Sequence, residues 1–284
     1  MSSPYRLGGR CMFERPNEGT QRRKRVFFLS VEGTTTEVQY FHCVERYKRE
    51  LEIDAIVHIE VLRRFDTRSD PDNVLKLLEE YIDFRDNNEF ENVISKLNLK
   101  SYDKNFIQMY LENPNSIKRR ERNEFENVLK QEHIDLVYLD FLSKYHGEND
   151  VFGIVIDRDR NSHSAEQLNN VINKCNANNY YWFLTNPCLE FWLLLHVSDV
   201  AEEYKECLDD ILANRLDEHG NSYVSNLLYN KTKQRKAIQN KTFEQYYLYN
   251  LDLAIDRAKT FALDSNLLDK LGSNMWKLFE LLRN

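Results

Sequence analysis

Two aspartates separated by one residue stand at the end of a short apolar run in this 284-residue chain. The segment from Val151 to Arg160 reads VFGIVIDRDR, so Asp157 and Asp159 follow the apolar residues directly. In an extended segment, residues i and i+2 point the same way, about 7 Å apart, so both carboxylates can face one point in space. Oxygen ligands in this arrangement suit a hard divalent cation.

A third carboxylate holds an equivalent place after an earlier apolar run. Val26 to Val31 reads VFFLSV, and Glu32 follows at once. If the two runs are neighbouring strands, Glu32 joins Asp157 and Asp159 at one edge of a sheet. Two unit charges about 6 Å apart repel by about 3 kcal/mol at an effective dielectric constant of about 20, so such a trio needs a cation.

The donor set predicts the ion. Magnesium binds through a few carboxylates while it keeps waters and substrate phosphates, so we expect Mg²⁺, with Mn²⁺ as the alternative ion. Zinc is disfavoured because these carboxylates show no close His or Cys partner. Glu32, Asp157 and Asp159 are therefore the predicted metal ligands and catalytic residues, with Glu32 as general base or acid.

A fourth carboxylate lies in a segment that is otherwise apolar. Proline at the first position after Asn186 predicts the start of a helix, and the residues that follow are apolar on almost every side, so this helix is expected to be buried. Glu190 inside it must be paired or bind a cation. A salt bridge and a site role both remain open for Glu190, whereas His196 is expected to be a satisfied core histidine.

Four strands separated by helical patterns surround these residues. Apolar runs or alternation at 26–31, 53–62, 151–156 and 180–184 predict an α/β fold with a parallel sheet and right-handed crossovers. Residues 85–149 are highly charged with helical spacing and predict a helical insertion outside the sheet. Residues 199–284 predict a helical C-terminal region packed on the core, and residues 1–25 a basic, flexible N-terminal arm.

Composition limits the partners. The net charge of −7 argues against a surface that is basic all over, although local basic patches remain. The five cysteines show no CxxC spacing, and no stretch is long enough to span a bilayer, so we expect a soluble cytoplasmic protein with reduced thiols and no membrane contact. Homo-oligomerisation is open.

Basic residues expected to contact nucleic acid are Arg158, Arg160, Lys118, Arg119, Arg120, Lys231 and Lys233.

The order of the motifs carries a resemblance. Glu32-Gly33 with Thr36, Glu37 and Tyr40-Phe41, then Asp-x-Asp, then Asn-Pro-x-x-Glu-x-Trp-Leu-Leu-Leu-His resembles the RloB family, which includes the AbiLii type of abortive-infection protein and carries a Toprim-like (Rossmannoid) core. By this resemblance Glu32 corresponds to the Toprim glutamate, and Asp157 and Asp159 to its metal-binding pair. Glu190 matches the glutamate of the Asn-Pro motif, and Glu37 is a further candidate.

The resemblance implies a function. We expect a Toprim-type, magnesium-dependent nuclease that cleaves DNA or RNA, including tRNA, in bacterial anti-phage defence, with a partner ATPase of the ABC or OLD-like kind. One alternative is a non-catalytic partner subunit in which the carboxylates bind metal only to hold the fold together. A second is a phosphatase or glycosyltransferase, both of which use Asp-x-Asp. The phosphatase is disfavoured because Asn161 stands where a hydroxyl residue is usual.

Overall fold

Five strands form one sheet, in the order β2-β1-β3-β4-β5. We describe a computed structural model, which covers residues 25–63, 70–87, 89–132, 134–144, 149–160, 162–234 and 237–284. The predicted N-terminal arm, apart from Arg25, lies outside these residues. The strands are β1 (Arg25–Val31), β2 (Val57–Val61), β3 (Val151–Asp157), β4 (Tyr181–Asn186) and β5 (Gly272–Ser273). β1 to β4 pair in parallel, and β5 pairs antiparallel to the end of β4.

The sheet is buried on both faces, which explains why most residues of β1 are apolar. Phe27 and Leu29 of β1 pack into one hydrophobic cluster, whereas Val26 and Phe28 pack into another on the opposite face. Successive side chains of a strand alternate between faces, so a strand covered on both sides is apolar throughout. The α/β fold class with a mainly parallel sheet and flanking helices is confirmed.

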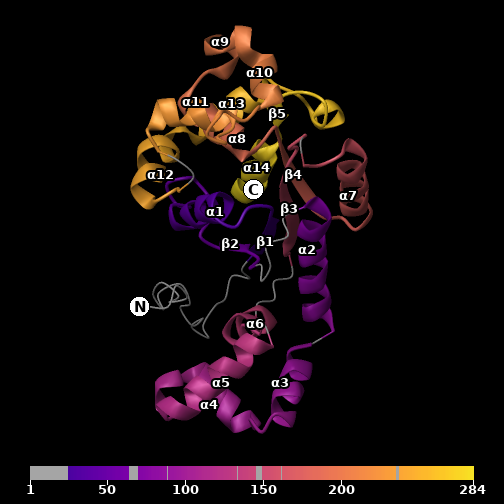
Figure 1. Ribbon diagram of the computed structural model, residues 1–284, viewed down its shortest axis with the longest axis vertical. Helices are drawn as coiled ribbons and strands as arrows, with labels where there is room; N and C mark the ends of the chain where they lie inside the picture. Colours follow the sequence, from indigo (N-terminus) through magenta and orange to yellow (C-terminus); the bar gives the residue numbers. More distant parts are fainter. Residues whose placement is uncertain are drawn as a thin grey trace.

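Helices cover the two faces (Figure 1). On one face lie α2 (Pro71–Asp86) and α7 (Ala165–Ala177). On the other lie α1 (Thr36–Arg46), α8 (Leu189–Val197), α11 (Tyr223–Thr232), α12 (Asn240–Tyr246), α13 (Leu251–Lys259) and α14 (Met275–Arg283). The C-terminal region also contains α9 (Val200–Glu203) and α10 (Leu208–Ala213), with single 3-10 turns at Lys205–Cys207, Leu248–Asn250 and Asp264–Asn266.

Between α2 and β3 the chain leaves the sheet. α3 (Glu89–Leu99), α4 (Lys104–Glu112), α5 (Arg119–Gln131) and α6 (Leu136–Lys144), with a 3-10 turn at Pro114–Ser116, lie together at the lower end of the view in Figure 1. They enclose a hydrophobic cluster of their own, which contains the fully buried Phe125. No strand occurs among the described residues of this segment, so the insertion is helical, as the charged helical pattern predicts.

α8 is buried on almost every side because nearly all its residues are apolar. The fully buried Trp192 donates its indole N–H to the hydroxyl of Tyr40 at 2.8 Å. Nδ1 of His196 lies 3.0 Å from the carbonyl oxygen of Trp192, and burial lowers the pKa of His196 to about 3. His196 is thus a neutral core histidine, as expected.

Among the described residues no helix is long and apolar enough to cross a membrane.

An ionic cluster joins the edge strand β2 to α1. Nδ1 of His58 lies 3.1 Å from Glu45, and Nε2 lies 3.4 Å from Glu60. Burial disfavours the imidazolium, but the hydrogen bonds and charges of the two carboxylates outweigh it and raise the pKa of His58 to about 9. His58 is therefore protonated at neutral pH in the folded protein.

We expect this cluster to make stability fall with rising pH. Since the pKa of His58 is higher in the folded than in the unfolded chain, its stabilisation is complete below about pH 6.5 and is lost as the pH rises through 9. The loss should be on the order of 3 kcal/mol. Urea unfolding of wild type and His58→Gln between pH 6 and pH 10 checks it, with the exposed His219→Gln as control. A constant difference between wild type and His58→Gln across this range would contradict the prediction.

Candidate functional site

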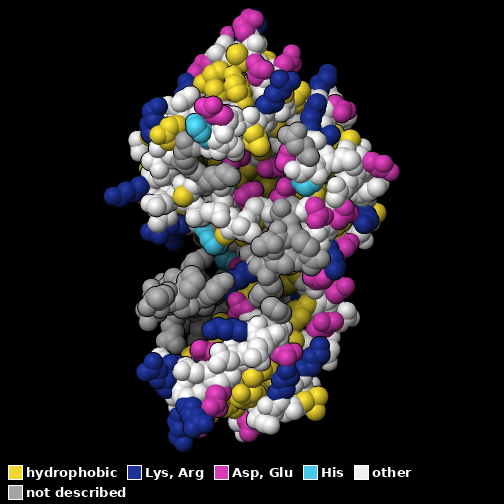
Figure 2. All heavy atoms as spheres, viewed as in Figure 1, with side chains coloured by type: hydrophobic (Ala, Val, Ile, Leu, Met, Phe, Trp, Pro, Cys, Tyr) yellow, Lys and Arg dark blue, Asp and Glu magenta, His cyan; other side chains and the backbone are white. Residues whose placement is uncertain are grey.

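Carboxylates from three separate segments line one cavity at the carboxyl edge of the sheet. Glu32 follows β1, Asp157 ends β3 and is followed by Asp159, and Glu190 lies in the first turn of α8. All four line a cavity of about 610 Å³. Figure 2 shows Asp and Glu side chains gathered in a hollow near the middle of the molecule. Open α/β sheets commonly build their sites at this edge.

The strand order brings Glu32 beside Asp157. β1 and β3 are neighbours, with Val31 paired to Val155, and the backbone N–H of Glu32 donates to the carbonyl of Val155 at 3.0 Å. The Glu32 carboxylate accepts the backbone N–H of Asp157 at 2.9 Å. Glu32 therefore contacts the backbone of Asp157, and its side chain lines the same cavity as Asp157 and Asp159.

Like charges in this cavity disfavour ionisation. Burial raises the pKa of Asp157 well above its ordinary value, and the charges of Glu32, Glu37 and Glu190 raise it further. Burial also raises the pKa of Glu37 to about 7, assisted by Glu190 and Glu32 and opposed by backbone N–H groups. A cation bound among these side chains would favour their ionised forms.

Glu37 lies against Gly33, in space that a side chain at residue 33 would fill. A Cβ atom on Gly33 would lie 1.9 Å from Oε2 of Glu37 and 2.4 Å from Oε1, far inside van der Waals contact. Glu37 lies in the first turn of α1 and is buried. The Glu-Gly sequence after β1 therefore has two effects. Glu32 supplies a carboxylate at the end of the strand, and Gly33 leaves room for the carboxylate of Glu37.

Glu190 belongs to the cavity rather than to an ion pair. Within the described part of the chain no Lys, Arg or His forms a salt bridge with it, so the salt-bridge alternative has no partner there. Its neighbour Cys188 also lines the cavity, and burial, followed by the charges of Glu190 and Asp157, raises the pKa of the Cys188 thiol well above its ordinary value.

A histidine that sequence spacing did not single out also reaches the site. Nε2 of the buried His163 lies 3.1 Å from Oε1 of Glu32, and this hydrogen bond raises the pKa of His163. Asp159 accepts the hydroxyl of Ser162 at 2.7 Å. Zinc is disfavoured in the sequence analysis for want of a close His or Cys partner. That premise is wrong, because the fold places His163 and Cys188 beside the carboxylates. The sequence did offer one indication of this contact, because His163 lies in the loop directly after the Asp-x-Asp motif.

Arg158 points into the protein, not toward a ligand. It is 7% exposed, its Nε donates to the carbonyl of Leu268 at 2.9 Å, and its Nη1 donates to the carbonyl of His163 at 2.7 Å. Arg160 donates to the carbonyl of Asp269. The prediction that Arg158 contacts nucleic acid is therefore corrected: its guanidinium holds the loop that carries His163 against the turn at residues 267–270.

The comparisons with known proteins give one match. The family model described as RloB-like protein matches residues 27–282. The chain belongs to the RloB-like family. Neither the curated proteins nor the solved structures yield a significant match.

The Asn-Pro motif of this RloB-like chain connects the site to the C-terminal region. The buried Asn186 donates its Nδ2 hydrogens to the carbonyls of Leu267 at 2.8 Å and Lys270 at 2.9 Å. Asp159 is tied to the same motif, because its backbone N–H donates to the carbonyl of Pro187 at 3.0 Å. The 267–270 turn is thus held by Arg158, Arg160 and Asn186 together, which fixes the Asp-x-Asp loop relative to α8.

The other predicted basic residues do not reach the cavity of this RloB-like protein. Lys118, Arg119 and Arg120 lie at the start of α5 in the helical insertion, exposed to solvent, and Arg120 pairs with Glu124 at 3.0 Å. Lys231 and Lys233 lie at the end of α11, where Lys231 pairs with Glu203. No Lys or Arg of the described residues lines the cavity.

The cavity fits a hard cation by its donor chemistry. Its ionisable lining is mainly carboxylate, and carboxylate oxygens are ligands that hard divalent cations prefer. Among the described residues, however, no three His, Cys, Asp or Glu side chains already stand together as a ligand set. Side-chain rotation around the cavity would have to complete the coordination.

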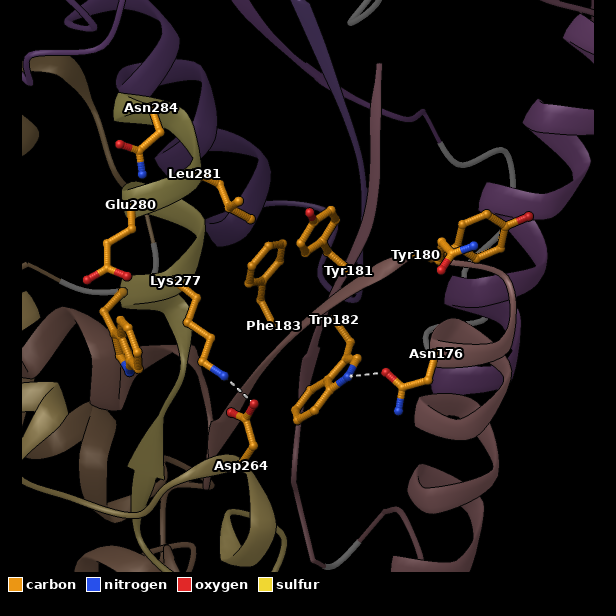
Figure 3. Close-up of a pocket in the computed structure, with 12 residues that line it drawn as sticks. Asn176, Tyr180, Tyr181, Trp182, Phe183, Asp264, Lys277, Glu280, Leu281 and Asn284 are labelled. Carbon is orange, nitrogen blue, oxygen red and sulfur yellow. Dashed lines mark hydrogen bonds and ion pairs between the residues drawn. The ribbon is translucent and has the colours of Figure 1, made fainter. Parts of the chain in front are cut away.

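A second cavity lies at the start of β4, away from the carboxylates (Figure 3). It is lined by Tyr181, Trp182, Lys277 and Glu280 among others. Its polar groups are used within the protein: Lys277 pairs with Asp264, and Trp182 donates to Asn176 at 3.2 Å. None of the predicted site residues line it, so we do not assign the chemistry of this RloB-like protein to it.

We expect His163→Ala to weaken metal binding without unfolding the protein. His163 orients the Glu32 carboxylate at 3.1 Å, and removal of such an outer-shell partner typically costs about 10–100-fold in metal affinity or activity. Titration of the apo protein with Mn²⁺, followed by electron paramagnetic resonance, measures the affinity. His163→Gln, which keeps a donor, should fall between wild type and His163→Ala. Unchanged Mn²⁺ affinity in His163→Ala would contradict the prediction.

Proposed function

We propose that this protein is a metal-dependent nuclease that hydrolyses phosphodiester bonds of nucleic acid. The observation that carries the proposal is the convergence of Glu32, Asp157, Asp159 and Glu190 on one cavity at the carboxyl edge of a parallel sheet. The family resemblance, with its Toprim-type assignment of the glutamate and the Asp-x-Asp pair, supports the same reaction.

The side chains take distinct roles. Asp157 and Asp159 would hold Mg²⁺ or Mn²⁺, with Glu190 of the same cavity as a further oxygen donor and Glu37 as an additional candidate. When bound, the cation would neutralise charge on the scissile phosphate and assist the departure of the leaving oxygen. Glu32 is held by the backbone N–H of Asp157 and by His163, so its carboxylate is positioned to accept a proton as general base.

The resemblance also supplies the biological setting. We place the nuclease in an anti-phage defence system, where a partner ATPase of the ABC or OLD-like kind holds or releases it. The predicted nucleic-acid contacts of Lys118, Arg119 and Arg120 would then involve a long substrate or the partner, since these residues project from the insertion. The proposal includes homo-oligomerisation, which a measurement of the mass of the protein in solution tests.

The test is direct cleavage. Purified protein is incubated with end-labelled DNA and RNA, single-stranded and duplex, in Mg²⁺, Mn²⁺ or EDTA, with and without its ATPase. Products that require the divalent ion are expected. No cleavage of any substrate in any condition, together with unchanged nucleic-acid ends in cells expressing the protein, would overturn the proposal and favour a non-catalytic metal-binding subunit.

A further inference from the structure

Tyr247 brings a buried phenol from the C-terminal region into the carboxylate cavity. It lies directly after α12, is only 2% exposed, and lines the same cavity as Glu190. Its hydroxyl makes no hydrogen bond within the described part of the chain, and unlike the hydroxyl of Tyr81 it is not sealed inside the core. Because polar groups in such positions nearly always have a hydrogen-bond partner, this hydroxyl indicates a partner inside the cavity.

Aromatic neighbours hold the ring of Tyr247 in place. It meets the ring of His196 edge to face, with centroids 5.4 Å apart and planes at 87°, and its centroid lies 6.1 Å from that of Phe243. The backbone N–H of Tyr247 donates to the carbonyl of Phe243 at 2.9 Å. A donor held in this way needs little reorganisation when a ligand arrives.

A phenol has a specific use in an acidic cavity. It is protonated at neutral pH, and burial, followed by the charge of Glu190, raises the pKa of Tyr247 above its ordinary value, so the hydroxyl donates a hydrogen bond without carrying charge. A lysine at this position would pair with the carboxylates and compete with a cation for them, whereas a phenol leaves them available. Ionised carboxylates and phosphate oxygens both only accept hydrogen bonds, so the hydroxyl supplies a donor that the carboxylates cannot.

We propose that Tyr247 is a substrate-binding residue of this site, whose hydroxyl donates a hydrogen bond to a non-bridging oxygen of the scissile phosphodiester. The inference rests on the proposed function and adds a residue to it. Hydrogen bonds to a charged phosphate are among the stronger ones in proteins. The C-terminal region would then supply part of the site as well as cover the sheet.

Tyr247→Phe removes the hydroxyl and keeps the ring that packs against His196. Because the hydroxyl has no partner within the described residues, the melting temperature of this variant should match that of the wild type. Tyr246→Phe is the matched control, since Tyr246 is the preceding residue and its hydroxyl accepts the Nε2 hydrogen of Gln245 at 3.1 Å instead of lining the cavity.

The experiment measures metal binding, substrate binding and cleavage separately. Electron paramagnetic resonance follows Mn²⁺ binding to the apo protein, and fluorescence anisotropy follows labelled DNA and RNA oligonucleotides in Ca²⁺. We expect Tyr247→Phe to bind Mn²⁺ as the wild type does, because a neutral phenol is not one of the ligands. Its oligonucleotide affinity should fall by about tenfold and its cleavage rate by about 100-fold, the order expected for one preorganised donor. Tyr246→Phe should match the wild type in every measurement.

A Tyr247→Phe protein that binds and cleaves nucleic acid as the wild type does would overturn the inference. A fall in its melting temperature or Mn²⁺ affinity would also overturn it, because the phenol would then serve the fold or the metal. So would a labelled strand that stays attached to denatured wild type but not to denatured Tyr247→Phe, since the phenol would then be the nucleophile.

Failure of this inference is distinguishable from failure of the nuclease proposal. If no condition gives cleavage by the wild type, the nuclease proposal fails, and the anisotropy comparison still decides whether the Tyr247 hydroxyl binds the strand. Cleavage by the wild type that Tyr247→Phe leaves unchanged, with unchanged affinity, rejects only the role of Tyr247.

Discussion

Asp157→Asn should abolish nuclease activity while the metal-free protein becomes more stable. Asparagine keeps the shape of the side chain but removes a charge that burial and the neighbouring Glu32, Glu37 and Glu190 disfavour. Relief of like-charge strain is expected to be worth on the order of 1–3 kcal/mol at neutral pH. Loss of a direct ligand should lower activity by more than the roughly 100-fold that loss of an outer-shell partner costs.

The stabilisation by Asp157→Asn should depend on pH in a defined direction. The folded protein raises the pKa of Asp157, so the wild type binds more protons folded than unfolded and its stability falls as the pH rises above the ordinary aspartate value. The variant lacks this dependence. Its advantage in melting temperature should therefore be largest at neutral pH and vanish near pH 4.

The measurement combines melting curves with activity. Mg²⁺ should raise the melting temperature of the wild type and leave that of Asp157→Asn nearly unchanged. Asp256→Asn, an exposed change on α13, should behave as wild type in every assay. A folded Asp157→Asn protein that still cleaves nucleic acid, or still protects cells fully against phage, would refute the nuclease mechanism. A destabilised or unfolded variant would point to the carboxylate as a structural element instead.

Gly33→Ala should disable the site indirectly, by displacing the side chain of Glu37. The added methyl group would overlap the Glu37 carboxylate, whose oxygens lie 1.9 and 2.4 Å from the position of the Cβ atom. The carboxylate is the end of a flexible side chain, so it can rotate away while the backbone stays in place. We expect a folded protein with about 10–100-fold lower metal affinity or activity.

A double-mutant cycle separates this explanation from a general disturbance of the turn. If Gly33→Ala acts by displacing Glu37, its effect and that of Glu37→Ala should not add, because both remove the same carboxylate. Thr34→Ala, at an exposed position in the same turn, serves as the control. Additive losses in Mn²⁺ affinity would show that Gly33 acts by another route.

Sequence patterns alone determine the sheet and the position of its carboxylates. Runs such as Val26–Val31 and Val151–Ile156 are mainly apolar on both sides of the pleat, which is typical of a strand covered on both faces. Strands with crossover helices run parallel, and parallel strands end at one edge, so acidic residues directly after such runs must share that edge. Glu32 and Asp157 meet for this reason, and the helical spacing of the charged insertion is equally local.

Tertiary structure decides what surrounds those carboxylates, because these contacts join residues far apart in the chain. The burial of Arg158 follows from its contact with the carbonyl of Leu268, and no local pattern distinguishes an arginine that binds a backbone turn from one that binds phosphate. The approach of His163 to Glu32 depends on the adjacency of β1 and β3. The side of the cavity that Ser225 and Leu228 line depends on how α11 packs against α8. Hydrophobic periodicity specifies which face of an element is buried, but the partner of that face is set by packing of the whole chain.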